Sequence, residues 1–213
     1  DITFANLGLL VVDEEHRFGV THKEKLRQMQ RQVDTLWLTA TPIPRTLQMS
    51  LLGARDLSMI NTSPRDRLPV QTEVREFGPE VIVEAIMREM DRGGQIYFVH
   101  NRIHSIDAMA DFLKRQLPLV KIGVAHGQMP ERELESVMVR FYHHEFDLLL
   151  STAIIESGLD LPSVNTIILH RADRFGLAQL YQLRGRVGRS ARQAYAYLLT
   201  PPFSTLTPEA NAR

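Results

Sequence analysis

The segment that decides the fold is Pro79-Glu-Val-Ile-Val-Glu-Ala-Ile-Met-Arg-Glu-Met-Asp-Arg-Gly-Gly-Gln-Ile-Tyr-Phe-Val-His100. Over residues 79–92 the apolar side chains recur at helical spacing, which predicts that Val83, Ile86, Met87 and Met90 point inward. Gly93-Gly94 ends this helix. The run at 95–100 is apolar almost throughout, which is typical of a buried strand. The segment therefore predicts a helix followed by a buried strand of an α/β protein.

The same alternation continues on both sides of this segment. Further strands are expected over residues 71–77, 120–125, 146–151, 164–170 and 194–199, and helices over 106–116 and 131–144. Nearer the N-terminus, strands are expected at 7–12 and 35–42, and helices at 21–32 and 45–57. Such alternation favours a parallel sheet with helices on both faces. The turn-rich stretch that follows predicts a linker at 61–71 between domains at 1–60 and 72–213.

Composition excludes several classes of protein. The 213 residues carry a formal net charge of zero, so a surface for nucleic acid has to be local. The sequence has no cysteine, which excludes disulfides, thiolate zinc sites and a cysteine nucleophile. No apolar run approaches the length of a membrane span. A start at Asp1, without Met and without a basic leader, predicts a fragment or a processed chain.

Polar residues follow four of the expected strands. In open α/β sheets ligands bind beyond the carboxyl ends of the strands. Asp13 is placed to hold Mg²⁺ and Glu14 to orient an attacking water, although an acidic turn would look the same. The hydroxyls of Thr39 and Thr41 are suited to sensing a neighbouring loop or to capping a helix. The other strand ends are followed by Asn101-Arg102 and by Thr152.

The stretch Gly176-Leu-Ala-Gln-Leu-Tyr-Gln-Leu-Arg-Gly-Arg-Val-Gly-Arg189 places three arginines and two glycines within six residues. Glycine weakens a helix by about 1 kcal/mol relative to alanine. Arginines at this spacing are suited to a polyphosphate and to charge developing on a transferred phosphoryl group. The alternative interpretation is the basic end of a helix with a glycine cap.

Taken together, the sequence resembles the motor of superfamily 2 helicases and translocases. The resemblance rests on motifs in the family's order: Asp13-Glu-Glu-His16 (motif II), Thr39-Ala-Thr41 (motif III), 97–102 (motif IV), 152–160 (motif V) and Gln182-Leu-Arg-Gly-Arg-Val-Gly-Arg189 (motif VI). It covers nearly the whole chain. It implies a RecA-like P-loop NTPase fold, with a nearly complete C-terminal helicase domain preceded by the last part of the ATP-binding domain.

Within that superfamily the chain resembles the RecG-like group, through Thr39-Ala-Thr-Pro-Ile-Pro-Arg-Thr-Leu47 and Phe175-Gly-Leu-Ala-Gln-Leu-Tyr181 among other stretches. Three stretches look most like the family of bacterial transcription-repair coupling factors: His22-Lys-Glu-Lys-Leu26, His126-Gly-Gln-Met129 and Ala194-Tyr-Ala-Tyr-Leu-Leu-Thr-Pro201. That family implies a cytoplasmic, ATP-driven translocase on double-stranded DNA. Such a protein displaces stalled RNA polymerase and recruits excision-repair proteins through modules that this chain lacks.

The resemblance also implies roles for individual residues. Asp13 would hold Mg²⁺, Glu14 would be the base for water, and Thr39 and Thr41 would couple ATP hydrolysis to DNA. The residues implied for nucleotide contact are Gly158, Asp160 and Gln182, with Arg189, and after it Arg186, as the arginine finger. Those implied for the DNA backbone are Asn101, Arg102, Gly127, Gln128 and Thr152. Contacts to phosphates carry no base information, which suits a motor that runs over any sequence.

One departure from the family pattern limits these expectations. No Gly-x-x-x-x-Gly-Lys-Ser/Thr occurs in the sequence, so the P-loop that holds the β- and γ-phosphates is missing. The chain alone is therefore expected to lack ATPase activity. Two alternatives stay open: a RecG-like helicase that remodels replication forks, and a non-catalytic module that binds DNA or protein.

Overall fold

The computed structural model describes residues 4, 6–13, 18–29, 33–39, 56, 58–60, 62, 68–153 and 161–212. The chain divides into two compact units, Asp1–Asn61 and Thr62–Arg213, and each is described by itself. Four of the predicted site residues lie outside the described residues: Glu14, Thr41, Gly158 and Asp160. Nearly all of the helix expected at 45–57 does too.

The first unit contains a two-stranded parallel sheet and a helix. Strands β1 (Leu9–Asp13) and β2 (Asp34–Leu38) pair in parallel, with Asp13 level with Leu38. Helix α1 (Val20–Met29) connects them, as a parallel pair requires a crossover. The two strands and the helix confirm the elements expected in this part of the sequence.

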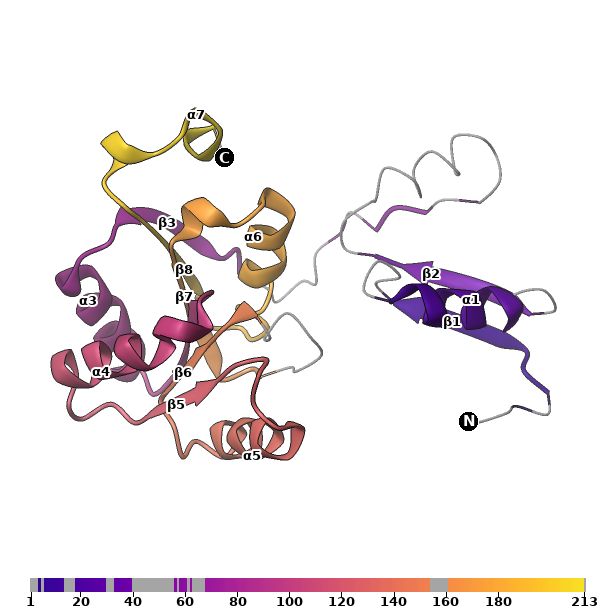
Figure 1. Ribbon diagram of the computed structural model, residues 1–213, viewed down its shortest axis with the longest axis horizontal. Helices are drawn as coiled ribbons and strands as arrows, with labels where there is room; N and C mark the ends of the chain where they lie inside the picture. Colours follow the sequence, from indigo (N-terminus) through magenta and orange to yellow (C-terminus); the bar gives the residue numbers. More distant parts are fainter. Residues whose placement is uncertain are drawn as a thin grey trace. The chain divides into compact units, whose positions relative to one another are not determined.

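The second unit is built on a six-stranded, fully parallel sheet (Figure 1). Its strand order is β3-β8-β7-β4-β6-β5. The strands are β3 (Gln71–Glu76), β4 (Gln95–His100), β5 (Ile122–Ala125), β6 (Leu148–Ser151), β7 (Val164–His170) and β8 (Tyr195–Thr200). Every residue of β4 is buried, which explains why its sequence is apolar rather than alternating.

Helices cover both faces of this sheet, as the alternating pattern predicted (Figure 1). Helices α3 (Pro79–Met90) and α4 (Ile106–Gln116) pack on one face, and α5 (Glu131–Tyr142) and α6 (Leu177–Arg184) pack on the other. The last described elements are a short turn of helix at Phe203–Thr205 and α7 (Pro208–Asn211). None of the described helices has both the length and the apolar character needed to cross a membrane.

Alternate residues of β4 feed two separate apolar clusters. Phe98 packs with Ile86 and Leu113 on the α3–α4 face. Val99 packs with Phe141 on the opposite face. Since successive strand residues point to opposite faces, a strand buried on both sides supplies both cores. This double coverage makes β4 and its neighbours a rigid support for the loops at their ends.

The expected inward position of Met87 is wrong. The buried stripe of α3 runs through Ile82, Ala85, Ile86 and Glu89, at the i, i+3, i+4, i+7 spacing of one helix face. Met87 lies off this stripe and is 42% exposed. The apolar spacing gave the wrong helix face because one of the four buried positions of α3 is occupied by an acidic residue, Glu89.

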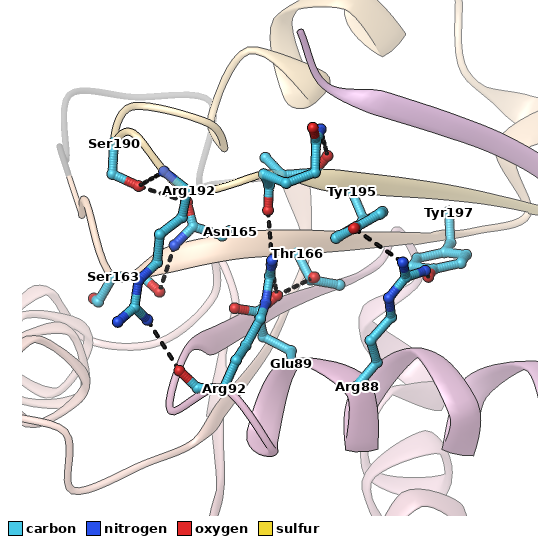
Figure 2. Close-up of polar contacts among 12 residues, drawn as sticks. Arg88, Glu89, Arg92, Ser163, Asn165, Thr166, Ser190, Arg192, Tyr195 and Tyr197 are labelled. Carbon is cyan, nitrogen blue, oxygen red and sulfur yellow. Dashed lines mark hydrogen bonds and ion pairs between the residues drawn. The ribbon is translucent and has the colours of Figure 1, made fainter. Parts of the chain in front are cut away.

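Glu89 has no exposed surface, and its carboxylate is held by polar partners (Figure 2). Its Oε2 accepts hydrogen bonds from the Thr166 hydroxyl and from the Arg92 guanidinium. The adjacent residue, Arg88, lies 4.0 Å from the ring centre of Tyr195 and donates to the Tyr195 hydroxyl at 2.9 Å. A buried carboxylate requires such partners, because an unpaired charge away from water is strongly destabilising.

Candidate nucleic-acid and nucleotide site

Three neighbouring strands of the second unit end beside one another and carry polar residues. Asn101 and Arg102 follow β4, Gly127 and Gln128 lie in the turn after β5, and Thr152 follows β6. The strands are adjacent in the order β4-β6-β5 and all run parallel. Their carboxyl ends therefore lie at the same edge of the sheet, which is where open α/β sheets bind ligands.

These five residues line one hollow of about 700 Å³, which we call the carboxyl-edge hollow. The structure thus brings together all five residues that were predicted from the sequence to meet the DNA backbone. Sequence reasoning missed three more lining residues, namely Ile103, His104 and Ala153. Each lies within two positions of a predicted residue. Including the one or two residues after Arg102 and after Thr152 in the prediction would have found them.

The lining of the hollow is suited to an anion. Its charged lining residue in the described chain is Arg102, and no carboxylate lines it there. Asn101, Arg102 and Gln128 are exposed donors, whereas Thr152 is 7% exposed and fixed by its backbone N–H, which donates to the carbonyl of Ala125 at 3.2 Å. Amide, guanidinium and hydroxyl donors of this kind contact phosphate oxygens in nucleic-acid complexes.

Two backbone hydrogen bonds between residues close in sequence shape the loops around the hollow. The Arg102 N–H donates to the carbonyl of His100 at 2.8 Å, which turns the chain sharply at the end of β4. The Met129 N–H donates to the carbonyl of His126 at 3.0 Å and closes the turn that carries Gly127 and Gln128. The lining residues are therefore held by turns that are anchored on buried strands.

The residues 182–189, here called the arginine segment, begin in α6 and continue into the loop that leads to β8. Leu183 and Val187 are fully buried and fix the segment against the sheet. Arg186 is half-buried and Arg189 is exposed. Gln182, Arg186 and Arg189 are not among the described residues that line the carboxyl-edge hollow.

Gly188 has two structural reasons to be glycine. Its φ is +76°, a left-handed conformation that side chains disfavour. An added Cβ would also lie 3.1 Å from Cβ of Ala194 and from Cγ2 of Val70. The glycine therefore lets the chain turn closely over the start of β8, and this turn separates Arg186 from Arg189.

The loop after the arginine segment is tied to α3 and β7 (Figure 2). The Ser190 hydroxyl donates to Asn165 Oδ1 at 3.0 Å. Arg192 donates through Nη1 to the carbonyl of Arg92 at 3.0 Å, and Arg92 donates through Nη1 to the carbonyl of Gln193 at 2.7 Å. These bonds fix the point at which the arginine segment re-enters the sheet.

A pair of histidines lies beside the hollow, and sequence reasoning did not find it. Nδ1 of His100 is 2.8 Å from Nδ1 of His170, and the two rings stack with centres 4.9 Å apart. Burial lowers the pKa of His170 to about 4, assisted by the nearby His100 and Arg171 and opposed by Asp173. Burial, and then His104, also lowers the pKa of His100. Both imidazoles are consequently neutral at pH 7.

In the first unit, Asp13 ends β1 and Thr39 follows β2. Because the strands are parallel, these two residues lie at the same edge of their sheet, and both are exposed. A single exposed carboxylate fits Mg²⁺, which usually keeps several waters and takes one or two protein carboxylates together with substrate phosphates. The described residues contain no group of three or more potential metal ligands that would hold an ion by themselves.

The fold, the carboxyl-edge hollow and the arginine segment define a helicase-type domain. A family profile described as "Helicase conserved C-terminal domain" matches residues 79–191, and the chain belongs to this family. Over all 213 residues it is 56% identical to the transcription-repair-coupling factor of Escherichia coli K12 and 55% identical to that of Bacillus subtilis 168. The chain spans 19% and 18% of the lengths of these two relatives.

Solved structures support the same assignment of fold. A structure titled RecG bound to three-way DNA junction matches the whole chain with 37% identity and a TM-score of 0.76, and the match covers 28% of that protein. Yeast Dbp5 L327V bound to RNA and ADP BeF3 matches 94% of this chain and 55% of its own, with a TM-score of 0.70. At 13% identity the second match shows the fold alone. Both agree with the predicted RecA-like parallel sheet.

Proposed function

We propose that this chain is part of an ATP-driven translocase on double-stranded DNA that displaces stalled RNA polymerase and couples transcription to excision repair. The observation that carries the proposal is the carboxyl-edge hollow, where Asn101, Arg102, Gly127, Gln128 and Thr152 meet beyond three adjacent strands. The 56% identity to a transcription-repair-coupling factor supports the choice of this function. RNA polymerase and excision-repair proteins would be contacted through parts that lie outside this chain.

In the proposed mechanism the hollow grips the sugar-phosphate backbone. Arg102 supplies charge, while Asn101, Gln128 and the Thr152 hydroxyl supply neutral donors to phosphate oxygens. Such contacts do not read bases, so affinity should depend on salt and not on sequence. This is the behaviour that a motor moving along arbitrary DNA requires.

The ATP part of the proposal assigns a role to each residue that the family resemblance implies. Asp13 would bind Mg²⁺, which would neutralise phosphate charge when bound, and Glu14 would orient the attacking water. Thr39 and Thr41 would couple hydrolysis to DNA. Gly158, Asp160 and Gln182 would contact the nucleotide, and Arg189 or Arg186 would stabilise charge on the transferred phosphoryl group. The domain limits that accompany this proposal are 1–60, 61–71 and 72–213.

The DNA part of the proposal is tested by fluorescence anisotropy with two duplexes of unrelated sequence, over a series of salt concentrations. Arg102→Gln is compared with Arg115→Gln, which makes the same change of charge at an exposed position near the other end of α4. Arg102→Gln should weaken binding to both duplexes equally. It should also reduce the slope of log K against log salt by about 0.9 for each phosphate that the variant no longer neutralises. Equal effects of the two variants would refute the role of the hollow.

The ATP part is tested in a chimera in which this chain replaces the matching 213 residues of the E. coli relative. The unaltered relative serves as the reference. The proposal predicts ATP hydrolysis that duplex DNA stimulates. DNA binding by the chimera without hydrolysis would instead favour the non-catalytic binding module.

A RecG-like function is the second candidate, and the whole-chain match to RecG bound to a three-way DNA junction favours it. In the first proposal the carboxyl-edge hollow contacts the DNA backbone alone, so that proposal predicts similar affinity for linear duplex and for a three-way junction at equal length. A preference of about tenfold or more for the junction, abolished by Arg102→Gln, would favour the RecG-like alternative.

A further inference from the structure

The histidine pair joins the carboxyl ends of two adjacent strands. His100 ends β4 and His170 ends β7, and the two residues are level in the parallel register. His100 is 5% exposed. A nitrogen-to-nitrogen hydrogen bond holds one proton, so one imidazole donates from Nδ1 while the other accepts at Nδ1. Each ring therefore fixes the tautomer and the orientation of the other.

From His100 the network continues to the loop that lines the hollow. Nε2 of His100 lies 2.8 Å from the Ser105 hydroxyl, and the Ser105 N–H donates to the carbonyl of Arg102 at 3.3 Å. The residues 101–104 all line the hollow, and they lie between His100 and Ser105 in the chain. The bond between His100 and Ser105 thus closes the loop at its base, with Asn101 and Arg102 held on it.

In the chain, His170 is followed by the turn that precedes the arginine segment. Arg171 follows in a left-handed conformation with φ of 58° and donates to Asp173 at 2.8 and 2.7 Å. The His170 ring also packs on Phe77, with ring centres 4.9 Å apart. The contact with Phe77 and the hydrogen bond to His100 therefore both restrict the orientation of the His170 ring.

We infer that His170 is a positioning residue, which acts through His100 and Ser105 to hold Asn101 and Arg102 in the orientation that binds the DNA backbone. The inference rests on the proposed function of the carboxyl-edge hollow. The donors of the hollow are exposed and would otherwise rotate freely, so an anchored loop base reduces the entropy cost when they bind phosphate. Neither histidine needs to touch DNA for this effect.

The test compares two variants. His170→Phe keeps an aromatic ring but removes the hydrogen bond to His100, whereas the amide of His170→Asn replaces Nδ1 as a hydrogen-bonding group. His143→Phe, at an exposed position after α5, serves as the control for the substitution itself. His170→Phe should weaken duplex binding about fivefold and shift the backbone amide resonances of residues 101–104. His170→Asn should restore both to near the wild-type values, and His143→Phe should change neither.

Imidazole ¹⁵N resonances give a readout independent of DNA. In the wild-type chain one Nδ1 of the pair should be protonated and the other not. In His170→Phe, His100 loses the partner that fixes its tautomer, so its two ring nitrogens should give ¹⁵N shifts averaged over both tautomers. If His170→Phe does not fold, Ser105→Ala replaces it, because this smaller change opens the same loop base at a half-buried position. Ser105→Ala should then weaken duplex binding by the same factor of about five.

The outcomes separate this inference from the proposed function. Wild-type amide resonances at residues 101–104 in His170→Phe would overturn the inference, whatever the affinity for DNA. Failure of the folded His170→Asn variant to restore them would also overturn it. If Arg102→Gln leaves DNA binding unchanged, the proposed function fails, while the resonances still report whether His170 positions the loop.

Discussion

The guanidinium of Arg92 donates to the backbone carbonyl of Gln193 at 2.7 Å and also pairs with the carboxylate of Glu89. One side chain just beyond α3 therefore stabilises a buried charge and fixes the loop that follows the arginine segment. Since Glu89 has no exposed surface, its carboxylate depends on Arg92 and Thr166 for compensation. Stability and the position of the arginine segment are consequently coupled at this point.

Arg92→Leu should therefore lower the free energy of unfolding by about 3 kcal/mol, the size expected when one partner of a buried ion pair is removed. Urea unfolding followed by circular dichroism measures this. Arg75→Leu breaks the exposed ion pair with Glu73 and should cost about 0.5 kcal/mol or less.

The double variant Glu89→Leu with Arg92→Leu tests the cause of this destabilisation. It should be more stable than Arg92→Leu alone, because no charge is left buried without a partner. A double variant as unstable as the sum of both single variants would show that the pair acts through packing instead.

Gly188→Ala should destabilise the chain by about 2 kcal/mol, since both the left-handed φ and the close approach of Ala194 and Val70 oppose a side chain. Gly93 is the matched control: its φ is +69°, but an added Cβ meets no atom within 4 Å. Gly93→Ala should therefore cost only the backbone part, about 1 kcal/mol. Equal unfolding midpoints for the two variants would contradict the contact argument.

Stability should also depend on the protonation of His170. Its folded pKa of about 4 lies below the ordinary value of 6.5, so between these values the unfolded chain binds a proton that the folded chain does not. The free energy of unfolding should accordingly fall as the pH falls from 6.5 to 4, by at most about 1.4 kcal/mol per pH unit from this group. Above its ordinary pKa of 6.5 the contribution of His170 should be constant.

Urea unfolding of wild-type and His170→Asn chains at several pH values between about 4.5 and 7.5 isolates this contribution. The difference between the two chains should change with pH below the ordinary histidine pKa and stay level above it. His143→Asn, at an exposed position, controls for the exchange of a histidine for an asparagine. A constant difference between wild type and His170→Asn would mean that His170 titrates normally in the folded chain.

The sequence was informative where a strand is buried on both faces and where a helix has a regular apolar stripe. The expected strands at 95–100 and 164–170 and the helix at 106–116 agree with the structure to the residue. Asn101, Gly127 and Thr152, which the family resemblance implied for the DNA backbone, lie at one hollow because residues past parallel strands share an edge. The roles assigned to the individual site residues stay predictions.

The side-chain contacts that could not be predicted from the sequence depend on which strands are neighbours in the sheet. His100 and His170 are 70 positions apart, and they meet only because β4 and β7 are neighbours in the sheet. The burial of Glu89 was hidden for a related reason, since its partner Thr166 lies on the same strand β7. Periodicity identifies apolar faces, and a charged residue on such a face is recognisable only once its partners are known.

The last prediction concerns which arginine acts on the phosphoryl group. In the chimera with the E. coli relative, Arg189→Lys should reduce DNA-stimulated ATP hydrolysis about 10³-fold, as expected for an arginine finger. Lysine keeps the charge but lacks the planar fork that holds two phosphate oxygens at once. Because Arg189 does not line the described part of the carboxyl-edge hollow, the affinity for duplex DNA should change less than about twofold.

Arg186→Lys and Arg174→Lys complete the comparison. Arg186 is half-buried next to the fully buried Val187, and its substitution should reduce hydrolysis less than that of Arg189. Arg174 is exposed before α6 and should tolerate lysine without a change in rate. A larger reduction with Arg186→Lys than with Arg189→Lys would instead identify Arg186 as the arginine finger. If DNA binding is intact, the arginine whose substitution slows hydrolysis most is the one that contacts the transition state.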